Sequence, residues 1–252
     1  MAPELAFALP GDLDSRTGGY LYDKRLIAEL TGLGWRVSHL ALPAGFPSAV
    51  EADRAEARRM VGACADRMLV MVDGLALGAL PDLAEAEADR LRLVALVHHP
   101  LALESGVDAA ARGRFVLSER RALACVRAVI VTSPATARML AADYGVPGAK
   151  ITVAEPGCDV VPPTTRSREH GMTRLLAVGS ITPRKGFDVL IEALARIADR
   201  PWRLTVAGSL ERAPEYAAAM QQAIALHGLG PRIDLVGEVT DCGPLYRDAD
   251  IF

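Results

Sequence analysis

Short apolar segments alternate with longer amphipathic segments along most of this 252-residue sequence. The apolar segments, such as residues 68–72 (MLVMV), are apolar throughout rather than at every second position. Strands with this composition are buried on both faces, which happens when helices cover both sides of a sheet. The alternation therefore predicts an α/β fold built on open, mostly parallel, doubly wound sheets.

The alternation is interrupted once, by residues 156–172 (PGCDVVPPTTRSREHGM), which contain three prolines and no periodicity. We therefore expect an amino-terminal domain at 1–155, a linker at 156–172 and a smaller carboxyl-terminal domain at 173–252. In the first domain we expect strands at 4–9, 35–40, 68–72, 91–97, 128–132 and 151–154, helices at 19–34, 51–66, 80–90, 115–126 and 133–144, and a turn at Asp73-Gly74. In the helix at 19–34, we expect an apolar side formed by Leu21, Leu26, Ile27 and Leu30. In the second we expect strands at 173–179, 203–207 and 233–237, helices at 186–199, 214–227 and 243–248, and a new strand from Ile251.

Composition excludes several classes of protein. The net charge of −3 argues against a general nucleic-acid binder, which would carry a basic excess. Four well-separated cysteines show no metal-ligand spacing, so we expect reduced thiols, no metal and a cytoplasmic protein. The first residues lack the pattern of a signal peptide, and no apolar run is long enough to span a membrane. Peripheral membrane contact stays open, although no basic amphipathic helix stands out.

Ligands of open α/β sheets bind at the carboxyl ends of the strands, so the strand-to-helix junctions are the places to search. The first junction, GDLDSRTGGY, ends with Gly18, Gly19 and Tyr20 as a helix begins. Two glycines there let backbone N–H groups approach an anion or a sugar, but they would equally suit a flexible loop. The G-x-G-x-x-G pattern of dinucleotide-binding proteins is absent.

Two further junctions carry ionisable side chains. His98 and His99 end a buried strand and precede Glu104, where an imidazole can bond a substrate hydroxyl or act as an acid or base. The alternative is a loop with incidental histidines. Asp73 ends another strand, where capping of the turn is favoured over binding of a sugar hydroxyl.

The fourth junction, residues 179–186 (GSITPRKG), places Arg184 and Lys185 before a helix. It is not a Walker loop, because Arg184 and Gly186 stand where that motif needs Gly and Ser or Thr. Cations at a helix start oppose the helix dipole unless an anion binds there, although a pair of surface cations is the simpler alternative. Only three of the 28 cationic residues are lysines, and Lys185 is one of them.

Several segments in this order resemble the GT-B glycosyltransferases of family 4, or glycosyl transferases group 1. They are the Gly18-Gly19 loop, His98 at a strand end, ITVAEPGCD (151–159), AVGSITPRKGFDVLIEAL (177–194), RLTVAGS (203–209) and IDLVGEVTDCGPLYRDADIF (233–252). The resemblance covers essentially the whole chain. It implies two facing doubly wound domains that transfer a sugar from a nucleotide-diphosphate sugar, with retention of configuration, to a glycan, lipid or small-molecule acceptor.

The resemblance also implies roles for individual residues, with no metal and no cofactor. His98 or His99 would lie near the transferred sugar, and Tyr20, Asp73 and Glu104 are candidates for binding sugar or acceptor. The donor diphosphate would be bound by Lys185, Arg184, Gly179, Ser180, Gly18 and Gly19. The nucleotide base would lie near Gly208, Gly237 and Glu238.

Two departures from the family pattern matter. Ser180 stands where the family usually has arginine, so one phosphate contact would be either lost or supplied by Arg184. The family's paired glutamates, E-x7-E, would fall beyond Phe252, so we expect a donor domain cut short and a chain with little or no activity by itself. A GT-B-like protein that binds a nucleotide or glycan without turnover is the alternative, and a nicotinamide-dependent oxidoreductase is disfavoured by the missing glycine fingerprint.

Overall fold

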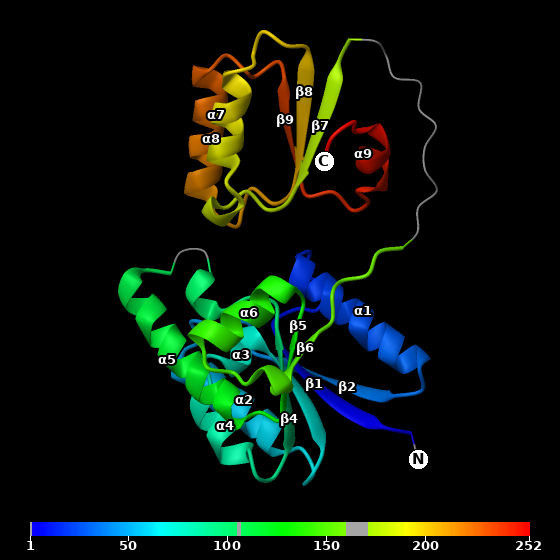
Figure 1. The fold of residues 1–252 in the computed structure, drawn as a ribbon, viewed down its shortest axis with the longest axis vertical. Coiled ribbons are helices and arrows are strands. Elements are labelled where there is room, and N and C mark those ends of the chain that lie inside the picture. The colour runs from blue at the N-terminus through cyan, green and yellow to red at the C-terminus, as the bar shows by residue number, and fades with distance from the viewer. Residues whose placement is uncertain (1, 105–106, 160–170) are drawn as a thin grey trace. The chain divides into compact units, whose positions relative to one another are not determined.

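The computed structural model describes residues 2–104, 107–159 and 171–252, which form two compact units, 1–158 and 159–252 (Figure 1). Most of the expected linker, at 160–170, lies outside the described residues. Each unit is an α/β structure with a parallel sheet, as the sequence predicts.

The first unit contains a six-stranded parallel sheet in the order β2-β1-β3-β4-β5-β6. Since β2 lies on one side of β1 and β3 on the other, the strand order reverses between β1 and β3, where open sheets bind ligands at their carboxyl edge. The strands are β1 (Glu4–Pro10), β2 (Arg36–Leu42), β3 (Leu69–Asp73), β4 (Arg92–Val97), β5 (Ala128–Val131) and β6 (Ile151–Val153).

Helices cover both faces of this sheet (Figure 1). On one face, Leu5, Phe7 and Leu9 of β1 belong to a cluster with the apolar side chains of α1; on the other, Ala6 and Ala8 face the remaining helices. The helices are α1 (Gly18–Gly32), α2 (Glu51–Gly62), α3 (Gly74–Leu77), α4 (Pro81–Glu87), α5 (Ala109–Cys125) and α6 (Pro134–Asp143), with 3-10 turns η1 (Leu101–Leu103) and η2 (Gly148–Lys150).

Three details of the first unit differ from expectation. The turn expected at Asp73-Gly74 is the start of α3, because the Asp73 carboxyl accepts a hydrogen bond from the Leu75 N–H and caps a helix. The helix expected at 115–126 begins at Ala109, because Asp108 caps it through the Ala111 N–H. Leu21, expected on the apolar side of the first helix, is 60% exposed.

The second unit has a three-stranded parallel sheet in the order β7-β8-β9, and α7 and α8 pack on one face of it (Figure 1). Ile251 pairs with Leu175 through a single parallel bridge, beside β7. The elements are β7 (Thr173–Val178), η3 (Pro183–Lys185), α7 (Phe187–Ala195), β8 (Trp202–Ala207), α8 (Pro214–Leu226), β9 (Ile233–Gly237) and α9 (Gly243–Asp248).

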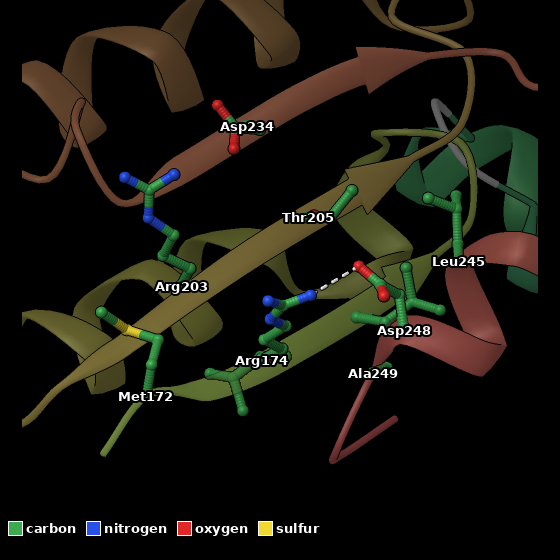
Figure 2. Close-up of a pocket in the computed structure, with 10 residues that line it drawn as sticks. Met172, Arg174, Arg203, Thr205, Asp234, Leu245, Asp248 and Ala249 are labelled. Atoms are coloured by element: carbon green, nitrogen blue, oxygen red, sulfur yellow. Dashed lines mark hydrogen bonds and ion pairs between the residues drawn. The ribbon is translucent and has the colours of Figure 1, made fainter. Parts of the chain in front are cut away.

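The other face of the second sheet is a depression of about 480 Å³, bordered by strand side chains and α9 (Figure 2). Arg174 crosses it to reach the Asp248 carboxylate at 2.9 Å. This depression lies on the sheet face, so it does not contain the predicted phosphate-binding residues at the strand ends.

The helix expected at 186–199 is shorter than predicted. Residues 183–185 form the turn η3, and α7 extends only from Phe187 to Ala195. Gly186 separates the two with a left-handed backbone, φ +67°, which a residue with a side chain adopts only with strain. All four cysteines are free thiols, and among the described residues no helix is long and apolar enough to cross a membrane.

Candidate active site

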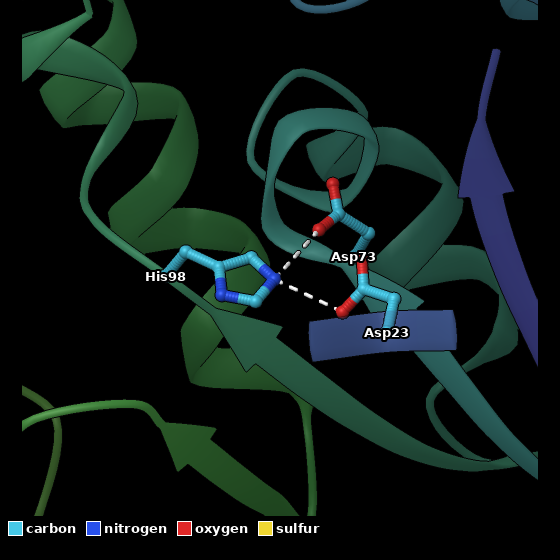
Figure 3. Close-up of side chains that lie close together, drawn as sticks. All are labelled: Asp23, Asp73 and His98. Carbon is cyan, nitrogen blue, oxygen red and sulfur yellow. Dashed lines mark hydrogen bonds and ion pairs between the residues drawn. The ribbon is translucent and has the colours of Figure 1, made fainter. Parts of the chain in front are cut away.

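His98 follows β4 at the carboxyl edge of the first sheet, next to the point where the strand order reverses. Its Nε2 atom lies 3.0 Å from Oδ1 of Asp23 and 3.8 Å from Oδ2 of Asp73 (Figure 3). Asp23 belongs to α1 and Asp73 ends β3, so three separate elements contribute to this group, which we call the histidine cluster.

The imidazole of His98 is held on several sides. An ideal Cβ on Gly19 would lie 3.3 Å from His98 Cδ2, so the glycine lets the start of α1 approach the ring. The Tyr22 ring meets the imidazole edge-on, at 5.4 Å between centroids. Thr136 Oγ1, at the start of α6, donates a hydrogen bond to the His98 carbonyl at 3.3 Å. These contacts fix both ring and backbone, as a positioned catalytic group requires.

Burial and charge set the protonation of the histidine cluster. Burial raises the pKa of Asp73 to about 7, and the nearby charge of Asp23 adds to the rise. For His98, burial lowers the pKa, but the hydrogen bond and charge of Asp23 and the charge of Asp73 outweigh it, so the pKa is raised overall. An imidazolium beside a protonated Asp73 would leave the cluster close to neutral.

A bound cation is the other way to balance two buried carboxyl groups. The ligand atoms of Asp23, Asp73 and His98 all lie within 4.8 Å of one another, so this donor set also fits a metal ion. Asp23 is 1% exposed and Asp73 4%. The negative charge of these two aspartates must therefore be neutralised within the cluster, by a proton or by a cation.

His99 does not join this cluster. Its Nε2 lies 2.5 Å from Oε1 of Glu104, so these two predicted site residues form a separate ion pair. Beneath them, the buried Glu119 of α5 accepts a hydrogen bond from the Leu101 N–H and supports the loop after β4. Burial raises the pKa of Glu119 to about 8. Of the two histidines, His98 contacts the buried aspartates and His99 contacts Glu104.

Gly18 and Tyr20 have different surroundings from Gly19. A Cβ on Gly18 would meet nothing within 4 Å, so packing does not demand glycine there. The Tyr20 hydroxyl donates to the Pro10 carbonyl at 2.5 Å, which closes the loop between β1 and α1. This loop contact explains Tyr20 without a ligand.

In the second unit, three predicted glycines lie side by side at the carboxyl ends of the strands. The Gly179 N–H donates to the Ala207 carbonyl and the Gly208 N–H to the Gly237 carbonyl, each at 2.8 Å. A Cβ on Gly208 would overlap the carbonyl oxygen of Gly179. Close approach of the strand ends therefore accounts for Gly208 before any nucleotide is considered.

The Lys185 side chain lies beside Gly179. Its Cε and Nζ atoms are 3.4 and 3.7 Å from the position that a Cβ on Gly179 would occupy, so the missing side chain leaves room for the lysine. Arg184 and Glu238 are exposed, and Ser180 is half-buried. The structure thus brings the Lys185 side chain to Gly179, at the carboxyl end of β7.

Asp23, Tyr22 and Glu119 contribute to the first site but were not predicted from the sequence. Asp23 carried a readable signal, because it lies four positions before Ile27 and seven before Leu30, on the apolar side of the helix. A carboxylate on that side has to find a partner when the helix packs. Tyr22 and Glu119 carried no such signal.

Two family models match the chain. Residues 69–161 match Glycosyltransferase Family 4, and residues 173–252 match Glycosyl transferases group 1. The chain is a group 1, family 4 glycosyltransferase. The first match contains Asp73 and His98 and the second contains Lys185, so both candidate regions lie within the segments that the family models match. None of the curated proteins is significantly similar to the chain in sequence.

Solved structures show the same GT-B fold at low identity. A glycosyltransferase from Rickettsia africae aligns with TM-score 0.60 and 17% identity over 99% of this chain and 72% of its own. Anabaena HepE, in complex with UDP and glucose, aligns with TM-score 0.63 and 18% identity over 97% and 73%. The lipopolysaccharide outer core galactosyltransferase WaaB aligns with TM-score 0.61 and 12% identity over 96% and 70%.

Proposed function

We propose that this glycosyltransferase transfers a sugar from a nucleoside-diphosphate sugar to a hydroxyl group of a glycan, lipid or small-molecule acceptor. We further propose that the reaction retains the anomeric configuration, needs no metal or other cofactor, and takes place in the cytoplasm, where free cysteines such as these persist. The observation that supports the proposal best is the histidine cluster at the carboxyl edge of the first sheet.

Each unit would supply one part of the chemistry. When the anomeric C–O bond breaks, the departing diphosphate gains negative charge, which the Lys185 ammonium and the N–H groups near Gly179 would stabilise. His98, held by Asp23, would bind a hydroxyl of the transferred sugar. The acceptor oxygen forms the new bond to the anomeric carbon, and its proton leaves with the diphosphate. UDP-sugars are the first donors to test, because HepE has been solved with UDP-glucose.

The experiment measures UDP binding by calorimetry and UDP-glucose turnover, in the protein encoded by the full-length open reading frame and in its variants. Lys185→Gln should weaken UDP binding about tenfold or more, the effect of losing a charge-assisted contact. His98→Ala should lower turnover about a hundredfold with UDP affinity little changed. His227→Ala removes a half-buried histidine of the second unit, paired with Glu192, and serves as the control. UDP binding that depends on Lys185 without any turnover would instead support a non-catalytic nucleotide-binding protein.

A further inference from the structure

Three arginines lie at the opposite edge of the first sheet from the histidine cluster. Arg67 precedes β3 by two residues, Arg92 begins β4 and Arg127 directly precedes β5. With Asp89 and Arg90 they line an open depression of about 520 Å³, which we call the arginine pocket. Since β4 has six residues at about 3.3 Å each, the pocket is roughly 20 Å from His98.

The sheet itself places these arginines. The Arg67 N–H donates to the Arg90 carbonyl at 2.8 Å, the Arg92 N–H to that of Met68 at 2.9 Å and the Arg127 N–H to that of Leu93 at 2.9 Å. Neighbouring strands are about 4.8 Å apart, so the three side chains start close together from a rigid base.

Arg67 is held in an unusual backbone conformation. Its φ is +63°, and among the described residues it alone has a positive φ without being glycine. This left-handed conformation is unfavourable for an L-residue with a side chain, and asparagine or glycine would relieve it. Unfavourable backbone conformations of this kind cluster at functional sites, which makes the Arg67 side chain a candidate for ligand binding.

The charges in the arginine pocket are not balanced by the protein. Arg90 is paired with Glu87 and Asp66, but in the described part of the chain the side chains of Arg67, Arg92 and Arg127 form no ion pair or hydrogen bond. Elsewhere in the unit, Arg58, Arg59 and Arg121 pair with acidic residues. The concentration of positive charge also contrasts with the net charge of −3 for the chain.

We propose that the arginine pocket binds a small, multiply charged oxyanion of the phosphate class, at a site separate from sugar transfer. Guanidinium groups form paired hydrogen bonds to phosphate oxygens, and three of them without carboxylate partners can surround a diphosphate-sized group. The volume falls within the range of ordinary small-ligand sites. Asp89 borders the pocket and would disfavour ligands that do not engage several arginines.

Calorimetry with inorganic pyrophosphate tests this site in the full chain at 150 mM salt. All variants carry Lys185→Gln, which removes the other expected diphosphate site. In this background, adding Arg92→Gln and Arg127→Gln should weaken pyrophosphate binding by about tenfold or more relative to Lys185→Gln alone. The control Arg112→Gln/Arg196→Gln, in the same background, removes two exposed arginines outside the pocket and should bind as before. Equal affinity in the pocket and control variants would overturn the proposal.

Two further measurements test the arginine pocket independently of calorimetry. Amide NMR signals of Arg67, Arg92 and Arg127 in the unmodified chain should shift on addition of pyrophosphate, which tests the site without any substitution. Cosedimentation with vesicles containing anionic phospholipid should show no dependence on these arginines. If the chain binds these vesicles and the pocket variant does not, the arginines bind a lipid surface and the proposal of a free anion is overturned. Unshifted amide signals at saturating pyrophosphate would also overturn it.

Discussion

His98 Nε2 lies 3.0 Å from a carboxylate oxygen of Asp23, a residue 75 positions earlier in the chain and 1% exposed. Neither side chain could stay in its charged form at this position without the other, because an isolated charge in the interior is costly in free energy. The pair joins α1 to the end of β4 and so connects the first helix to the histidine cluster.

Asp23→Asn should lower the pKa of His98, because it removes the charge and the hydrogen bond that raise this pKa against the effect of burial. The pKa can be followed by NMR titration of the imidazole protons. Glu29→Gln, on an exposed part of the same helix, should leave the His98 titration unchanged. An unchanged His98 pKa in Asp23→Asn would show that the buried hydrogen bond does not set its protonation.

Gly19→Ala should displace the His98 ring, because the added methyl group would lie 3.3 Å from Cδ2. We expect changed imidazole NMR shifts and turnover reduced about tenfold or more, the usual result of a small misplacement of a catalytic group. Gly32→Ala is the matched control, since it lies in the same helix with nothing within 4 Å of the added atom. Normal turnover in Gly19→Ala would mean that the ring position is not critical.

Gly208→Ala should destabilise the second unit by about 2 kcal/mol or more, because its methyl group would overlap the Gly179 carbonyl and separate β7 from β8. Thermal unfolding of the full chain measures the effect. Gly230→Ala, where a Cβ meets nothing within 4 Å, should change the midpoint little. Equal midpoints for the two variants would contradict the close approach of the strand ends.

The stability of the first unit should fall as pH rises from about 5 to about 8. Glu119 has a folded pKa of about 8 and Asp73 of about 7, both above their ordinary values, so the folded state retains protons that the unfolded chain releases. The raised pKa of His98 acts in the same direction. Each carboxyl contributes a slope of up to about 1.4 kcal/mol per pH unit, measurable by urea unfolding.

Glu119→Gln isolates one of these contributions. The amide keeps an acceptor for the Leu101 N–H but cannot ionise, so the variant should show a shallower loss of stability and unfold at higher urea than the parent near pH 8. Glu85→Gln, at a half-exposed pair with Arg121, should keep the parental slope. Parallel pH profiles for the parent and Glu119→Gln would show that Glu119 ionises normally.

Removal of divalent cations with EDTA should leave turnover unchanged, because a proton on Asp73 can neutralise the histidine cluster without a metal. The assay compares UDP-glucose turnover before and after EDTA, and after addition of Mg²⁺, Mn²⁺ or Zn²⁺. Turnover lost with EDTA and restored by one of these ions would make Asp23, Asp73 and His98 a metal site instead.

The strands were predictable to within about two residues from sequence, because short apolar segments bounded by turn residues mark strands through local composition. Helix ends were less predictable. The start of α5 at Asp108 and the break at Gly186 depend on a side-chain cap and on a left-handed residue, which compete with the propensities of their neighbours.

The sequence by itself determined that this chain forms parallel α/β sheets and which strand ends carry unusual residues, since local apolar patterning decides both. Only the tertiary structure decided that Asp23 meets His98 and that His99 turns to Glu104. The tertiary structure alone also brings Arg67, Arg92 and Arg127 together at one edge of the first sheet. The reason is that parallel strands bring together residues distant in sequence, and the register between strands is a property of the whole sheet.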